Sequence, residues 1–193
     1  MPEFSLWSVF YNYGSVKTMF HYEKSLTPSE LDKEFSDISE NIAKLGFPEG
    51  FSEFVPYAIS ELFANVKEHS RAKKATVSIS VRGNKCVINI TDNGIGFRKS
   101  YIAKKIYPKD EFSAIEFALG GLSTKSQERG FGLYSIKQLV EELGGEITVK
   151  TGKAMVEIRQ NKTVSRDSPV YTEGVDIALK IPVKKVEFYK FVQ

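Results

Sequence analysis

The chain has 193 residues, of which 41% are hydrophobic and 26% are charged, a composition typical of a soluble globular protein with one well-buried domain. The formal net charge of +3 is too small to indicate a nucleic-acid-binding protein, and the single cysteine, Cys86, excludes an internal disulfide framework. We expect no membrane anchor and a cytoplasmic location, because no segment is apolar for long enough to span a bilayer and the N-terminus lacks a signal-peptide pattern.

The first predicted elements are a strand at residues 17–24 and a helix at residues 27–46. The dipeptide Thr27-Pro28 is typical of a helix start, and Gly46 is typical of a helix end. Apolar residues recur at helical spacing between these two points. The aromatic-rich residues 1–16 suit either core packing or a dimer contact, so a homodimer stays open.

A second helix is predicted from about residue 52 to residue 70, with polar residues along one edge of its apolar face. Glu61, Asn65 and His69 follow one another at intervals of four residues. A glutamate can hold or activate a nucleophile, and an amide oxygen such as that of Asn65 can bind Mg²⁺. Taken alone, the pattern favours a solvated helix edge without a specific role, and His69 suits a structural or capping position.

Two alternating strands, residues 76–81 and 86–92, follow and form a predicted hairpin. Asp92 continues the apolar face of the second strand, where a carboxylate is costly unless a donor reaches it. Gly94 and Gly96 then lack Cβ atoms, which allows positive φ angles and the close approach of a ligand. Asp92 is therefore either the seat of a planar hydrogen-bond donor or part of an Asp-Asn-Gly turn, and these residues favour neither.

A third helix is predicted at residues 131–143, and glycines stand at its start. Gly130 and Gly132 would let an anion reach the free N–H groups of the first turn, which carry partial positive charge. Glycines also punctuate loops, but Lys125 and Arg129 just upstream favour an anion site.

The remaining segments complete one predicted domain, residues 1–193, since we find neither a repeat nor a long linker. Residues 98–129 have weak periodicity and are predicted to form a long, mobile excursion. The last predicted strands are 146–151, 154–159 and 174–182, and residues 161–173 have no assigned role. The pattern predicts an α/β two-layer sandwich, with a mixed, mostly antiparallel sheet and helices on one face.

The order of these motifs resembles the histidine-kinase-like ATPase superfamily. That group includes sensor histidine kinases, DNA gyrase, the MutL repair protein, the ninety-kilodalton heat-shock chaperone and anti-sigma-factor serine kinases. The resemblance covers about residues 25–182 and rests on three motifs in order: Glu61 and Asn65 on a helix, Asp92-Asn-Gly-Ile-Gly after a strand, and Gly130-Phe-Gly132 opening a helix.

The resemblance implies a role for each matching residue. Glu61 matches a catalytic glutamate near the nucleophile, Asn65 the asparagine that coordinates Mg²⁺, and Asp92 the aspartate that accepts the exocyclic amine of adenine. Gly94 and Gly96 match the glycines of the loop that borders the purine. Residues 98–129 match the ATP lid, with Lys125 near the phosphates. Gly130 and Gly132 match the second glycine motif, at the phosphates. One departure is Gly174-Val175, because the family often has Gly-Thr there, and this leaves the details of the adenine pocket open.

The resemblance implies a protein that binds ATP and Mg²⁺ and acts on a partner protein. Its length is closest to that of stand-alone regulatory kinases of the anti-sigma-factor type, so we expect a protein kinase or ATPase. Two alternatives stay open: a nucleotide-dependent binding module without phosphotransfer, and the catalytic part of a sensor histidine kinase. Neither His21 nor His69 resembles a phospho-acceptor.

Overall fold

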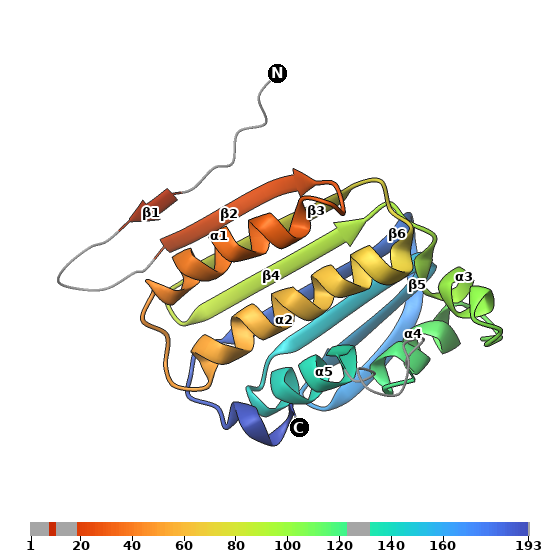
Figure 1. Cartoon of the computed structure of the whole chain (residues 1–193). Coiled ribbons are helices and arrows are strands. Elements are labelled where there is room, and N and C mark those ends of the chain that lie inside the picture. Colours follow the sequence, from red (N-terminus) through yellow and green to blue (C-terminus); the bar gives the residue numbers. More distant parts are fainter. Residues whose placement is uncertain (1–7, 11–18, 123–131, 193) are drawn as a thin grey trace.

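The computed structural model describes residues 8–10, 19–122 and 132–192 and arranges them as a sheet with helices packed on one face (Figure 1). In the described residues the sheet has six strands in the order β1-β2-β3-β4-β6-β5, and each neighbouring pair is antiparallel. The strands are β1 (Ser8–Phe10), β2 (Met19–Leu26), β3 (Ala75–Arg82), β4 (Lys85–Asp92), β5 (Glu146–Arg159) and β6 (Lys162–Pro182).

Helices α1, α2 and α5 lie across one face of the sheet, α3 lies near one end of it, and α4 packs against β5 (Figure 1). This arrangement confirms the predicted α/β fold class, although the described sheet is antiparallel throughout rather than mixed. The helices are α1 (Leu31–Ala43), α2 (Phe51–Asn65), α3 (Gly96–Ala103), α4 (Glu111–Leu119) and α5 (Gly132–Glu142), with a π-helical turn η1 (Val66–Ser70) and a 3-10 turn η2 (Phe188–Lys190).

The core forms between the helices and the sheet because β3 and β4 bury alternate residues. Ile79 and Ile88 are fully buried and are paired across these two strands. Ile59 of α2 and Ile136 of α5 are fully buried above the sheet. No helix in the ranges that the structure describes is long and apolar enough to cross a membrane.

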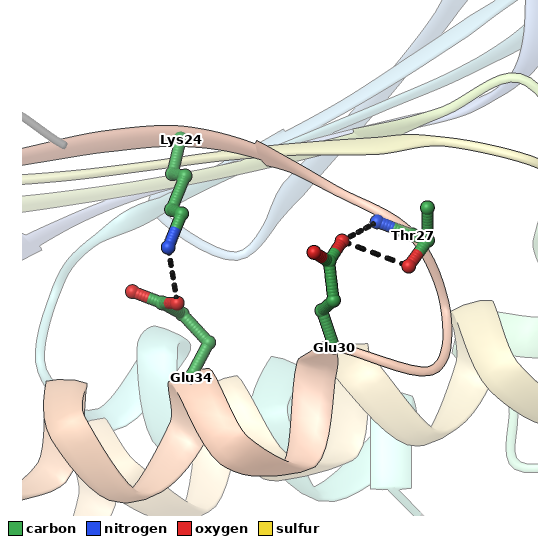
Figure 2. Close-up of polar contacts among 4 residues, drawn as sticks. All are labelled: Lys24, Thr27, Glu30 and Glu34. Atoms are coloured by element: carbon green, nitrogen blue, oxygen red, sulfur yellow. Dashed lines mark hydrogen bonds and ion pairs between the residues drawn. The ribbon is translucent and has the colours of Figure 1, made fainter. Parts of the chain in front are cut away.

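The first helix begins later than the sequence predicts, at Leu31 rather than Thr27 (Figure 2). The Glu30 carboxylate accepts hydrogen bonds from the backbone N–H of Thr27, at 2.7 Å, and from its hydroxyl, at 2.8 Å, which holds residues 27–30 in a turn. One turn further on, the buried Glu34 forms a 2.7 Å ion pair with Lys24 and joins α1 to β2.

Two other segments differ from the sequence prediction. Residues 98–122, the described part of the predicted excursion, contain most of α3 and all of α4. The predicted strands 146–151 and 154–159 are one bulged strand, β5. The unassigned residues 161–173 belong mostly to the first half of β6, which pairs with β5 and has a register shift between Asp167 and Thr172.

Candidate functional site

A cavity that is open to solvent and has an enclosed volume of about 80 Å³ lies at the end of the sheet where β4 meets the helices. The α2–η1 segment, α3, α4, α5 and β6 provide the rest of its wall. Most of the lining is apolar, and the apolar side chains are Leu62, Val66, Ile90, Phe97, Tyr101, Ala118, Leu122, Leu133, Val175 and Ile177. A concave, mostly apolar site with a few polar groups is typical of small-molecule binding.

Helix α2 and the turn η1 bring one row of polar residues to the cavity. Glu61, Asn65 and His69 all line it. Glu61 and Asn65 are four residues apart in α-helix, so their side chains are neighbours on one face. The helix turns π-helical after Asn65, and this wider turn still carries His69 to the cavity. The three residues therefore line a cavity and do not form an open, solvated helix edge.

Asp92 ends β4 with its side chain in the cavity wall, and only 5% of the residue is exposed. Burial raises the pKa of its carboxyl from 3.8 to about 6, while backbone N–H groups of Gly94 and Val175 favour the ionised form and oppose that rise. The Gly94 N–H donates to Asp92 Oδ1 at 2.7 Å. Asp92 is thus a buried acceptor in a largely apolar wall.

Asn93 and Gly94, which follow Asp92, make the contacts that hold the turn. Asn93 accepts hydrogen bonds on Oδ1 from the backbone N–H groups of Lys73 and Lys74, at 3.0 and 2.9 Å, and so fastens the turn. A Cβ atom on Gly94 would overlap the Ser70 carbonyl oxygen, so the close neighbour there is protein backbone. Asn93 and Gly94 therefore serve the geometry of the turn.

Gly96 has a different position from Gly94. It lines the cavity, has a φ of +76° and begins α3. A glycine adopts this backbone conformation without strain. Of the two glycines that the sequence places beside a purine, the structure puts Gly96 in the cavity wall and Gly94 behind it.

Helix α5 meets α2 at the cavity. A Cβ atom on Gly132, the first residue of α5, would overlap the Glu61 carboxylate, so a larger residue there would displace the end of the Glu61 side chain. Both residues line the cavity. The other predicted phosphate-binding residues, Lys125, Arg129 and Gly130, lie outside the described residues.

Helices α3 and α4 complete the wall, and the weak periodicity of their sequence did not predict them. Tyr101 of α3 donates from its hydroxyl to the Leu122 carbonyl oxygen at 2.5 Å, and this contact closes the segment on itself. The start of α4 carried a signal that could have found it: the Asp110 side chain accepts from the Ser113 N–H, and the Ser113 hydroxyl accepts from the Asp110 N–H.

The acidic and amide groups at the cavity suit a metal ion that takes most of its ligands from phosphate oxygens and water. The described residues contain no group of three or more histidine, cysteine, aspartate or glutamate side chains that could hold a metal ion. The amide oxygen of Asn65, next to the Glu61 carboxylate, suits a hard cation such as Mg²⁺, which usually keeps several waters and binds phosphate oxygens.

Comparison with known proteins bears on the whole cavity. Residues 52–185, well over half of the chain, match the model of the histidine kinase-, DNA gyrase B- and HSP90-like ATPase family. A further similarity is to the sensor histidine kinase LiaS of Bacillus subtilis (strain 168), with 24% identity over 100 residues. That alignment covers 52% of this chain and 28% of the relative. The chain therefore belongs to the family of histidine kinase-, DNA gyrase B- and HSP90-like ATPases.

Proposed function

We propose that the cavity binds ATP with its adenine against Asp92. The observation that carries this proposal is the buried carboxyl of Asp92 in a largely apolar wall. An ionised carboxyl accepts hydrogen bonds and cannot donate them. It therefore suits the exocyclic amine of adenine and opposes the carbonyl oxygen that guanine carries at the same ring position.

The triphosphate extends towards Glu61, Asn65 and the start of α5. Asn65 holds Mg²⁺ through its amide oxygen, and the phosphates and water supply the other ligands. The metal neutralises phosphate charge, while Glu61 orients the attacking hydroxyl or water and accepts its proton. The contact between Glu61 and Gly132 supports this arrangement, because it brings the glutamate next to the first residue of α5, the helix start that we propose for the phosphates.

The activity that these groups support is phosphoryl transfer to a partner protein, or ATP hydrolysis that regulates a partner. The partner is a protein rather than nucleic acid or membrane, and ATP chemistry of this kind suits the cytoplasm. The similarity to LiaS favours a second candidate, the catalytic part of a sensor histidine kinase. A nucleotide-dependent binding module without phosphotransfer is the third.

Titration with ATP and GTP, with and without Mg²⁺, tests the binding proposal. We expect ATP to bind more tightly than GTP, and Mg²⁺ to strengthen ATP binding. Equal affinity for the two nucleotides would remove Asp92 from base recognition, and the absence of binding would overturn the proposal. Transfer of the terminal phosphate from labelled ATP to proteins of a cell extract then separates a kinase from an ATPase or a binding module.

A further inference from the structure

Thr151 lies behind the wall of the cavity near Asp92, where we propose that adenine binds, and does not itself line the cavity. Thr151 of β5 is only 1% exposed, and its hydroxyl donates to the Gly174 carbonyl oxygen at 2.7 Å. The same hydroxyl lies close to α3, because a Cβ atom on Gly96 would come within 2.6 Å of it. Thr151 thus lies between the start of α3 at Gly96 and the Gly174 backbone, which packs against Asp92.

The bond from Thr151 reaches Asp92 through a single peptide unit. The Gly174 carbonyl and the Val175 N–H belong to the same planar group, so holding one end fixes the direction of the other. Thr151 holds the carbonyl, and the Val175 N–H favours the ionised form of Asp92. Hydrogen bonds linked in this way also polarise one another, which strengthens the donor.

The backbone around this peptide leaves little freedom. Gly174 has a φ of +66°, and a Cβ atom there would overlap both the backbone and the side chain of Asp92. Because Gly174 and Val175 bring no side-chain hydroxyl, the hydroxyl that orients their shared peptide comes from the neighbouring strand.

We propose that Thr151 is a positioning residue for Asp92 and thereby sets the preference for a purine with a 6-amino group. The inference rests on the proposed function, because the preference requires that Asp92 recognise the base. Without the hydroxyl, the Gly174–Val175 peptide loses one of its two anchors. The Val175 N–H is then held less firmly towards the carboxylate, and the hydrogen bond from the amine to the carboxylate weakens.

The test compares two ligands that differ only in that amine: ATP and purine riboside triphosphate, which has hydrogen at the 6-position. Calorimetric titration of wild type, Thr151→Val and Thr151→Ser gives the ratio of the two affinities for each protein. Thr151→Val removes the hydroxyl at nearly constant size, and we expect it to reduce the preference for ATP roughly 3- to 10-fold. Thr151→Ser keeps the hydroxyl and is expected to retain most of the wild-type preference.

Thr148→Val is the matched control, since Thr148 lies on the same strand, is only half-buried and pairs with Ala178 away from the cavity. Its affinity ratio should equal that of wild type. If Thr151→Val is too unstable to titrate, Thr151→Ala takes its place, because it also removes the hydroxyl and adds no bulk.

The outcomes separate the inference from the proposed function. An equal loss of affinity for both ligands would make Thr151 a packing residue only and would overturn the inference, as would an unchanged ratio. A wild-type protein that binds ATP but does not prefer it to purine riboside triphosphate would also overturn it, together with the role of Asp92. A wild-type protein that binds neither triphosphate would overturn the proposed function itself.

Discussion

Replacing Asp92 with asparagine separates the effect of the carboxylate on the free energy of unfolding from its effect on ATP affinity. The substitution keeps the size of the side chain but removes its charge. Burial raises the pKa of Asp92 from 3.8 to about 6, and each unit corresponds to about 1.4 kcal/mol. The ionised acid therefore costs the empty protein up to about 3 kcal/mol at neutral pH.

The sign of the pH dependence follows from the direction of the shift. The folded protein holds the Asp92 proton up to about pH 6, whereas the unfolded chain releases it near pH 4. The contribution of Asp92 to the free energy of unfolding is therefore complete below pH 4 and is lost as the pH rises through 6. Wild type should lose stability relative to Asp92→Asn across this range.

We expect Asp92→Asn without ligand to be about 1 to 3 kcal/mol more stable than wild type at pH 7.5, a rise of roughly 2–4 °C in Tm per kcal/mol. The lower end allows for an amide that satisfies the N–H groups of Gly94 and Val175 less well. ATP affinity should fall about 10- to 150-fold, because a hydrogen bond to a charged group is worth roughly 1.5–3 kcal/mol.

Melting curves at pH 5 and 7.5, with ATP titrations at the higher pH, provide the measurement. Asp37→Asn, at an exposed position on α1, is the control and should change neither quantity. A variant that is less stable than wild type at both pH values and binds ATP equally well would refute the reasoning. Asp92 would then be a residue of the turn alone.

Three further predictions concern the rest of the cavity. Asn65→Ala should abolish most of the Mg²⁺ dependence of ATP binding, while Asn41→Ala on the exposed side of α1 should not; an unchanged dependence would exclude Asn65 as the ligand. Glu61→Gln should still bind ATP but turn it over ~10²–10⁴-fold more slowly, whereas equal turnover would exclude acid–base work by Glu61. Hydrogen exchange in residues 98–122 should slow when ATP is added, because these residues hold two helices that line the cavity, and identical exchange in both states would argue against a closing lid.

The sequence predicted those parts of the site that local patterns determine. Asp92 faces the cavity because strand alternation places it on the inner face, and Glu61 and Asn65 share a wall because helical spacing places them one turn apart. Both patterns depend only on residues within a few positions of one another. Strand alternation and helical spacing therefore predict correctly which side chains share a face in the folded chain.

The parts that the sequence did not predict depend on distant contacts. Tyr101 and Leu122 become part of the wall through a hydrogen bond across 21 positions, in a segment whose apolar periodicity is weak. Thr151 reaches Gly174 across 23 positions, within a strand that a bulge interrupts. Neither contact can be predicted from sequence periodicity, because each joins residues that are brought together only by the tertiary fold.

The turn interpretation of Asp92-Asn93-Gly94 describes Asn93 and Gly94, and it is compatible with the proposed base-binding role of Asp92. Asn93 and Gly94 serve the turn, through bonds to Lys73 and Lys74 and through contact with Ser70. Those interactions hold the backbone after β4, and that backbone in turn supplies the Gly94 N–H to Asp92. A buried carboxylate raises the energy of the empty fold, so it needs a rigid frame that keeps it in place until a donor arrives. The turn therefore supports the proposed binding site and is not an alternative to it.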